Sequence, residues 1–210
     1  SYTLLNNYKS LSCDYELKIY GTSAGRCLLS MQSDIVGYVG WCTEEYLQKF
    51  TTQMKNDSPT VVLFGRFDTW LDESKGGKEI KCENCNYIEV LSNRFSNIIE
   101  NSKQTVIITP VPTYRDNIAE SYLYKDYVWG DEITLNKSEW DEYIKETKEY
   151  LISFSNENTI FLNSEEVFCN SKINKCFASK DNEIYYTDNN HLSIEGSQLL
   201  IDEIIYKLTN

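Results

Sequence analysis

The chain has 210 residues, of which 41% are hydrophobic and 25% charged, an ordinary globular composition with enough apolar residues for one sizeable core. The formal net charge is -12. A nucleic-acid binder needs a basic surface, so this charge argues against nucleic acid as a partner. No apolar run in the sequence approaches the roughly 20 residues that a membrane-spanning helix needs.

Seven cysteines are many for a cytosolic enzyme of this length, and disulfides or metal binding would explain them. A structural zinc site uses paired Cys-x-x-Cys knuckles or Cys/His combinations, and only Cys82 and Cys85 have that spacing. We therefore expect disulfides, no metal or cofactor, and an extracytoplasmic location. Cys169 and Cys176 bracket a short polar loop and form the natural pair, whereas the state of Cys82 and Cys85 stays open.

The first half of the chain predicts two strands and two amphipathic helices in alternation. An apolar run at 17–20 predicts a strand, and a helix is expected after Thr43 with Leu47, Phe50 and Met54 on one face. A β-branched run at 61–64, followed by Gly65, is typical of a buried parallel strand. The next helix carries Leu91, Phe95 and Ile98 at helical spacing.

The second half continues this alternation. Strands are predicted at 106–108, 160–162 and 184–186, and helices from about 138 to 154 and from about 193 to 208. The pattern predicts a three-layer α/β/α fold with a mostly parallel sheet and a single domain over residues 1–210. In such sheets a ligand binds beyond the carboxyl ends of the strands. Because the chain begins at Ser1 rather than Met, we expect a processed, excised or truncated piece of a longer protein.

The segment from Asp188 to Ser193 carries the clearest chemical signal. His191 is the sole histidine, and it lies three residues after Asp188 and just before the last helix. A histidine there could take a proton from a nucleophile while the carboxylate orients its imidazole. A loop acid beside a histidine that caps a helix would give the same short pattern, so spacing alone leaves both interpretations open.

The wider block around this pair resembles a known family. Tyr185-Tyr186-x-Asp188-x-x-His191-Leu192-Ser193-x-x-Gly196, preceded by the Cys169–Cys176 loop, is similar to the final block of the SGNH hydrolase/acyltransferase superfamily. More narrowly, it resembles the SGNH domain at the C-terminus of acyltransferase-3 membrane proteins that O-acylate carbohydrates. The resemblance implies a flavodoxin-like version of the α/β fold, with Asp188 and His191 as catalytic residues.

Further matches to the family occur in chain order. The segment from Val61 to Trp70, with Gly65 and Arg66 after the apolar run, is similar to the family's strand that ends in an Arg/Trp segment. Thr109-Pro110-Val111-Pro112 is similar to its proline-containing exit from the next strand. Cys27 and Cys42 are similar to its early cysteine pair, and the resemblance implies a disulfide between them.

The nucleophile is less clear, because the Gly-Asp-Ser motif of the superfamily is missing from the sequence. Ser1 would fit a motif whose first residues and first strand lie upstream of this chain, and the sheet would then lack that strand. Ser23, in a Gly-x-Ser context, would keep the first strand inside the chain but leaves little room before Val61 for the elements that must follow. We expect Ser1, with Ser23 as the alternative, and a chain without a nucleophile is the remaining possibility.

The resemblance also implies donors for the oxyanion of the tetrahedral intermediate, which must meet preorganised N–H groups. These are the N–H of the nucleophile, the N–H of Gly25 and a group from the Gly65-Arg66 turn. An ion pair of Arg66 with Asp68 or Glu73 is the structural alternative. Aromatic residues crowd the segment after Thr109 and could stack on sugar rings or simply pack a long loop: Tyr114, Tyr122, Tyr124, Tyr127 and Trp129.

The family therefore implies acyl transfer, with acetyl the first expectation, to a carbohydrate hydroxyl through a Ser-His-Asp acyl-enzyme mechanism. The partners would be a carbohydrate acceptor and an acyl donor that a covalently linked membrane domain delivers, so the domain would be tethered outside the cytoplasm. A free-standing esterase would share the chemistry with water as acceptor. A catalytically inactive module that binds glycan or a partner domain is the alternative from another class.

Overall fold

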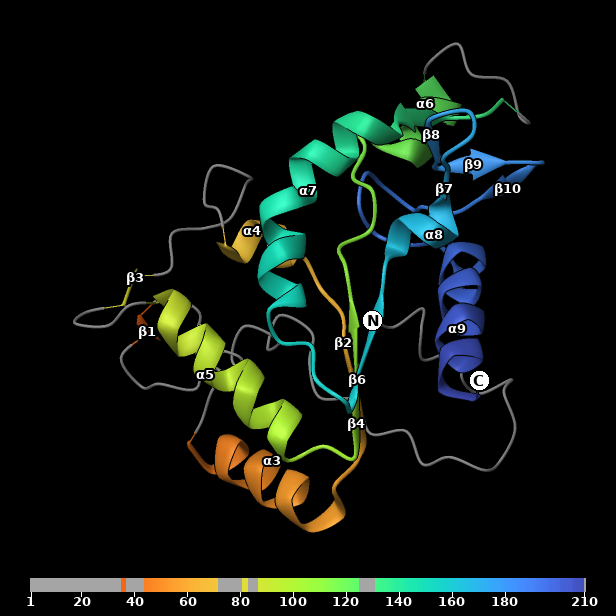
Figure 1. Ribbon diagram of the computed structural model, residues 1–210. Helices are drawn as coiled ribbons and strands as arrows, with labels where there is room; N and C mark the ends of the chain where they lie inside the picture. Colours follow the sequence, from red (N-terminus) through yellow and green to blue (C-terminus); the bar gives the residue numbers. More distant parts are fainter. Residues whose placement is uncertain (1–34, 37–43, 72–80, 83–86, 125–130, 210) are drawn as a thin grey trace. The chain divides into compact units, whose positions relative to one another are not determined.

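The computed structural model describes residues 35–36, 44–71, 81–82, 87–124 and 131–209 (Figure 1). The chain divides into two compact units, and each takes segments that are distant in the sequence. We call the described residues within 17–108 and 147–161 the sheet unit. The described residues within 109–146 and 162–210 form the disulfide unit. The expectation of a single domain stays a prediction.

The sheet unit is built on three strands in the order β2-β4-β6: β2 (Thr60–Leu63), β4 (Gln104–Ile108) and β6 (Thr159–Leu162). β2 and β4 run parallel, with Thr60 opposite Gln104 and Leu63 opposite Ile107. Between β4 and β6 the hydrogen bonds advance in the same direction on both strands, from Thr105 N–H to the carbonyl of Asn158 and from Thr109 N–H to that of Leu162. The α/β class with a parallel sheet is therefore confirmed.

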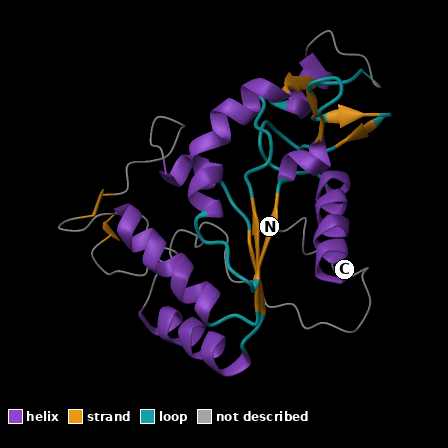
Figure 2. Cartoon of the chain, viewed as in Figure 1, coloured by secondary structure: helices purple, strands orange, loops and turns teal. Residues whose placement is uncertain are grey.

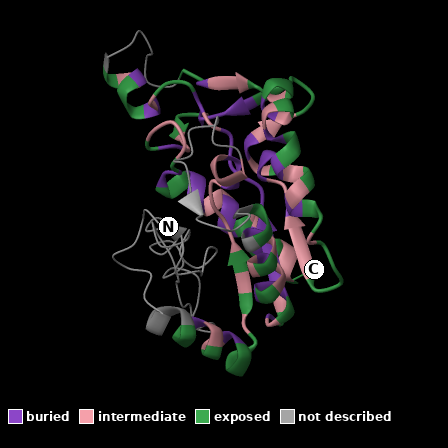
Figure 3. Cartoon of the chain, turned by 90° about the vertical axis from the view of Figure 1, so that its left-hand side faces the viewer, coloured by how far each residue is buried: buried purple, intermediate pink, exposed green. Residues whose placement is uncertain are grey.

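Helices pack on this sheet through the apolar faces that the sequence predicts. They are α3 (Glu44–Asp57), α5 (Tyr87–Glu100) and the last part of α7 (Lys137–Ile152). Their buried side chains form one cluster with Ile107 of β4 and with Phe67, which follows β2: Phe50, Met54, Leu91, Phe95, Ile98, Ile99 and Leu151. Figure 3 shows buried residues on one side of the helices and exposed residues on the other. In β4, Val106 and Ile108 are fully buried too, as in a strand covered on both faces.

Short elements complete the sheet unit. The turn after β2 leads into a five-residue helix, α4 (Phe67–Leu71), whose Phe67 ring lies edge-on to the Phe95 ring with centroids 5.5 Å apart. Two two-residue strands, β1 (Ile35–Val36) and β3 (Lys81–Cys82), pair in antiparallel register. The predicted strand at 17–20 lies outside the described residues.

The disulfide unit contains short strands and helices rather than a parallel sheet (Figure 2). One antiparallel sheet has the strand order β5-β8-β7, and β9 and β10 form a separate pair. Its elements are α6 (Ile118–Tyr124), β5 (Thr134–Asn136), the first part of α7, α8 (Ser164–Phe168), β7 (Cys169–Asn170), β8 (Lys175–Phe177), β9 (Ser179–Lys180), β10 (Glu183–Ile184) and α9 (Ile194–Thr209).

The strand predicted at 184–186 differs from the expectation. Only residues 183–184 form a strand, and they pair antiparallel with β9 instead of joining the parallel sheet. Asp181 and Asn182 have positive φ angles of 52° and 67°, a conformation that Asn and Asp tolerate in tight turns. The two-residue turn that they form folds the chain straight back on itself. The predicted helices at 138–154 and 193–208 are confirmed as α7 and α9, with ends shifted by one or two residues.

Candidate active site

The loop between β10 and α9 holds Asp188 and His191. Its ends are joined by a bridge between Tyr186 and Leu192, and the N–H of Thr187 donates a 2.8 Å hydrogen bond to the carbonyl of His191. Inside the loop, Oδ1 of Asp188 accepts the N–H groups of Asn190 and His191, each at 2.8 Å. These local bonds explain the three-residue spacing, because an aspartate side chain readily bonds backbone N–H groups two and three positions later.

The second carboxylate oxygen engages the imidazole. Nδ1 of His191 lies 2.6 Å from Oδ2 of Asp188. The Asp188 side chain is 32% exposed and that of His191 75% exposed, so the ring is oriented by a carboxylate yet open to solvent. With Nδ1 bonded to Asp188, Nε2 is the ring atom left to exchange a proton with a reacting group. This is the relation between base and orienting acid that a nucleophile-activating histidine requires.

Two opposing effects act on the carboxyl group of Asp188. Partial burial raises its pKa, because burial disfavours the charged form. The hydrogen bonds from the N–H groups of Asn190 and His191, together with the bond and charge of the His191 ring, lower the pKa by more. The pKa of Asp188 is therefore below its ordinary value, which favours the charged carboxylate beside the ring of His191.

Ser193 and Gly196 place this loop on helix α9. The Ser193 hydroxyl accepts the N–H of Gly196 at 3.0 Å, as a helix N-cap does, and donates to the carbonyl of Ile184 in β10. A Cβ on Gly196 would clash with the backbone carbonyl of Tyr185. Both residues therefore hold the start of α9 tightly against the segment that leads into Asp188, which explains their place in the motif.

Aromatic packing supports the loop from inside the disulfide unit. The N–H of Tyr114 donates to the carbonyl of Asn189 at 2.8 Å, and the Tyr114 and Tyr186 rings meet edge-on with centroids 5.0 Å apart. Both rings are buried, and burial raises the pKa of both hydroxyls. Tyr114 thus packs under the loop and is no platform for a sugar ring, which corrects the stacking interpretation for this residue.

The other aromatic residues after Thr109 give less evidence for or against stacking on a sugar ring. The Tyr122 hydroxyl lies 2.7 Å from the Asp131 carbonyl and 2.7 Å from the Ser179 hydroxyl, so it ties α6 to β9. The side chains of Tyr124, Tyr127 and Trp129 lie outside the described residues. Stacking on a sugar stays a prediction for those three.

The Gly65-Arg66 turn belongs to the sheet unit. Arg66 donates to both carboxylate oxygens of Asp68, and the shortest bonds are Nε to Oδ1 at 2.9 Å and Nη2 to Oδ2 at 2.8 Å. The Asp68 side chain is fully buried, whereas that of Arg66 is 27% exposed. A buried carboxylate needs such a bidentate partner, so this pairing fixes the arginine side chain. The role of Gly65 and Arg66 toward an oxyanion stays a prediction.

Several predicted site residues lie outside the described residues: Ser1, Ser23, Gly25, Cys27 and Cys42. The structure therefore brings Asp188 and His191 together within the disulfide unit and describes Gly65 and Arg66 in the sheet unit. The nucleophile and the Gly25 donor stay predictions, as does the pair Cys27–Cys42.

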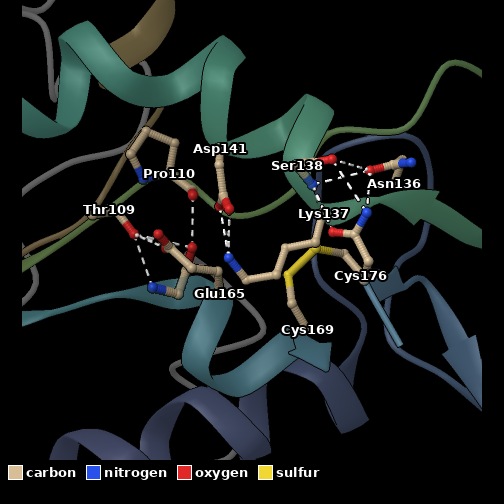
Figure 4. Close-up of a disulfide and its surroundings, with 11 residues drawn as sticks. Thr109, Pro110, Asn136, Lys137, Ser138, Asp141, Glu165, Cys169 and Cys176 are labelled. Atoms are coloured by element: carbon tan, nitrogen blue, oxygen red, sulfur yellow. Dashed lines mark hydrogen bonds and ion pairs between the residues drawn. A yellow bond between two sulfur atoms is a disulfide. The ribbon is translucent and has the colours of Figure 1, made fainter. Parts of the chain in front are cut away.

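Cys169 and Cys176 form a disulfide between neighbouring strands (Figure 4). The two residues face each other in the antiparallel register of β7 and β8. The turn between them is tied to the start of α7, because Nδ2 of Asn174 donates to Oδ1 of Asn136 at 3.0 Å and the N–H of Ser138 bonds the same Asn136 oxygen. The covalent link and the amide contacts together hold the antiparallel sheet of this unit.

One polar cluster was not predicted as part of a site. Thr109, Ser164 and Glu165 are buried where β4 and β6 end, and their side chains bond one another. The signal was present in the sequence, because polar residues directly follow two strands that we predicted to be parallel. The rule that ligands and polar groups gather at the carboxyl ends of such strands would have pointed to them.

The described part of the chain contains no group of three or more His, Cys, Asp or Glu side chains placed to hold a metal ion. Among the helices of the same part, none is both long and apolar enough to cross a membrane.

Comparison with known families identifies the class. The family model described as SGNH domain (fused to AT3 domains) matches residues 12–205. The chain therefore belongs to the SGNH domain family that occurs fused to acyltransferase-3 domains. This membership supports acyl-transfer or esterase-type chemistry in general. Searches of curated proteins and of solved structures gave no match.

Proposed function

We propose that this domain transfers an acyl group, with acetyl the first expectation, to a carbohydrate hydroxyl through a covalent acyl-enzyme. The observation that carries the proposal is the 2.6 Å contact between Nδ1 of His191 and Oδ2 of Asp188 in an exposed loop. Membership of a family fused to acyltransferase-3 domains supports transfer to an acceptor over simple hydrolysis. The Cys169–Cys176 disulfide supports a location outside the cytoplasm.

The proposed mechanism follows from the roles of the pair. Nε2 of His191 takes the proton of a serine hydroxyl as the oxygen attacks the carbonyl carbon of the acyl donor. Asp188 stabilises the imidazolium, and the histidine then protonates the leaving group of the donor. In the second half, the same Nε2 takes the proton of the acceptor hydroxyl as its oxygen attacks the acyl-serine. The histidine then returns this proton to the serine oxygen as the bond between that oxygen and the acyl group breaks, and the acylated acceptor leaves. Ser1 is the proposed nucleophile and Ser23 the alternative.

Charge develops on the acyl oxygen in both halves of the reaction. Preorganised N–H donors must meet this charge, and we assign the task to the N–H groups of the nucleophile, Gly25 and Gly65. The firm pairing of Arg66 with Asp68 supports a structural task for that side chain in shaping the turn. The acyl donor would be delivered by the linked membrane domain.

The test is acylation of the intact chain by an activated acetyl ester, followed by mass spectrometry to locate the acyl-serine. We expect the label on Ser1 and a loss of at least about 10³-fold in turnover for folded His191→Ala. Ser171→Ala, at an exposed serine, is the matched control and should behave as the wild type. Label on Ser23 would reassign the nucleophile, and wild-type turnover by folded His191→Ala would overturn the mechanism.

The acceptor is tested separately. Acyl-enzyme offered a mixture of carbohydrates in water should give acylated carbohydrate in excess of free acetate. Fast release of acetate alone would favour the esterase. A wild-type chain that takes up no acyl label from the ester or from a fluorophosphonate would favour the inactive binding module.

A further inference from the structure

The Thr109–Ser164–Glu165 cluster is a network of buried hydrogen bonds at the ends of two strands (Figure 4). Oγ1 of Thr109 accepts the N–H of Ser164 at 2.8 Å and lies 3.2 Å from Oε2 of Glu165. The Ser164 hydroxyl donates to the carbonyl of Pro110 at 2.7 Å. Thr109 and Ser164 are fully buried and Glu165 is 5% exposed. The network therefore fixes the chain at Thr109-Pro110 to the first turn of α8.

One connection runs from this network to the catalytic loop along the backbone. The segment from Thr109 to Tyr114 is mostly buried and contains Pro110 and Pro112, whose rings restrict the backbone. At its far end the N–H of Tyr114 donates to the carbonyl of Asn189. Asn189 directly follows Asp188. The position of Thr109 therefore influences the position of the loop that contains Asp188.

A second connection runs through α8 itself. Phe168, at the other end of this five-residue helix, is buried against the Tyr186 ring at a centroid distance of 5.7 Å. Tyr186 precedes Asp188 by two residues and bridges to Leu192. Both sides of the catalytic loop are thus attached to elements that the Thr109–Ser164–Glu165 network holds together.

We propose that Thr109 and Glu165 are positioning residues for the Asp188–His191 pair. The inference rests on the proposed function, because it assigns them a task in that reaction. An active-site pair acts well only when its groups are held within about 0.5 Å of the productive geometry. His191 is itself largely exposed, so its surroundings restrain it little and the loop backbone must do so.

The main test is Thr109→Val, which keeps the shape of the side chain and removes the hydroxyl. We expect kcat to fall about 10-fold with KM changed less than about 2-fold, because a slightly displaced base slows the chemical step rather than binding. Thr109→Ser restores the hydroxyl and should recover most of the rate. Thr105→Val is the matched control, because Thr105 lies on β4 four residues before Thr109, is equally buried, and its hydroxyl has no hydrogen-bond partner among the described residues.

Glu165→Gln provides a second variant if Thr109→Val does not fold. It keeps the size of the side chain but replaces one of the two carboxyl oxygens by an amide NH2 group, which cannot accept a hydrogen bond, and so weakens the bond to Thr109. We expect kcat to fall here too, but by less, about 2- to 5-fold. An unchanged kcat in both folded variants would overturn the proposal, and so would equal losses in Thr109→Val and Thr105→Val.

The sole histidine allows a readout that does not depend on activity. Nitrogen NMR of the neutral imidazole reports which ring nitrogen holds the proton, and Asp188 should hold it on Nδ1 in the wild type. In Thr109→Val we expect a larger fraction with the proton on Nε2, as in the reference variant Asp188→Asn. An unchanged tautomer ratio in folded Thr109→Val would show a purely structural role and overturn the proposal.

The two readouts separate this inference from the proposed function. If the wild type transfers no acyl group but the tautomer shifts in Thr109→Val, the reaction is wrong and the positioning holds. If the wild type is active and neither kcat nor the tautomer responds, the positioning is wrong and the reaction holds.

Discussion

The sheet unit and the disulfide unit both bury apolar side chains, but covalent and polar links add more to the disulfide unit. In the sheet unit, apolar faces of three helices close over parallel strands, and Phe95 alone meets the rings of Phe67, Tyr150 and Phe154. In the disulfide unit the strands have two or three residues each, and a disulfide, a helix cap and side-chain bonds to the backbone add to apolar packing around Trp140, Ile144 and Tyr186. Such polar contacts are directional, whereas hydrophobic packing is not.

This difference has a chemical consequence. Asp188 and His191 lie in the disulfide unit, where individual hydrogen bonds hold their loop. Directional bonds of this kind are suited to holding two side chains at a set distance. The sheet unit contributes its own polar pair, Arg66 and Asp68, but buries the carboxylate completely. One pair is thus built into the interior and the other is presented to solvent. Substitutions in the two units should therefore affect stability and activity to different extents.

The largest loss of stability is expected for Phe95→Ala in the sheet unit. Removing a fully buried ring leaves a cavity and costs about 4 kcal/mol of unfolding free energy. Asn93→Ala, on the exposed side of the same helix, should cost less than about 0.5 kcal/mol. Chemical denaturation measures both, and similar values for the two variants would contradict the hydrophobic account of this unit.

Gly196→Ala should come next, at about 3 kcal/mol, because the new methyl group meets the backbone of Tyr185, which cannot rotate away. Gly65→Ala is the matched variant in the sheet unit, where the methyl group would lie 3.3 Å from the movable ring of Trp70. It should cost clearly less. Thermal unfolding of the two variants compares these losses of stability. A smaller loss for Gly196→Ala than for Gly65→Ala would mean that α9 does not pack closely against the Tyr185 backbone.

Removing the Cys169–Cys176 disulfide should have a somewhat smaller effect. For a loop closed over a sequence separation of 7, restricting the unfolded chain contributes about 2.5 kcal/mol. The double variant Cys169→Ala/Cys176→Ala avoids placing a new hydroxyl at the buried Cys176. Its unfolding free energy is compared with that of the wild type without reductant. Equal values, or both cysteines open to alkylation in the unreduced wild type, would count against the pairing.

The smallest effect concerns pH. The pKa of Asp188 is lower in the folded state than in the unfolded chain, so the folded state holds its proton less tightly. The stability that this gives is complete above the ordinary aspartate pKa of about 4 and is lost as pH falls through the lower folded value. Unfolding free energies from pH 7 to pH 3 should therefore fall less steeply for Asp188→Asn than for the wild type. Parallel curves would contradict the lowered pKa.

Much of the secondary structure was accessible from the sequence, because the signals are local. Helical spacing of apolar residues located α3, α5, α7 and α9, and β-branched runs located β2, β4 and β6. The short helices α4, α6 and α8 and the antiparallel pairs were missed. A helix of five to seven residues or a strand of two or three residues shows too few turns or alternations for a period to be recognised. The positions of such elements depend on contacts with the rest of the fold.

The contact between Asp188 and His191 is local as well. Asp188 and His191 are three residues apart, and the hydrogen bonds that join them lie within one loop, so the sequence by itself determined this contact. The pairing of Arg66 with Asp68 is local as well, and the structure adds that the carboxylate is fully buried. Glu73, the other partner that the sequence suggested, lies outside the described residues. The burial of Tyr114 likewise depended on Tyr186, which is distant in the sequence.

Only the tertiary structure could reveal the Thr109–Ser164–Glu165 network. Thr109 and Ser164 are 55 positions apart, and they meet because β4 and β6 end side by side in a parallel sheet. A sequence pattern states which residues follow each strand, but strand order and register decide which of them touch. Those depend on the summed packing of many side chains. The support of the Asp188 loop was therefore decided in three dimensions, whereas the contact between Asp188 and His191 depends on a few consecutive residues.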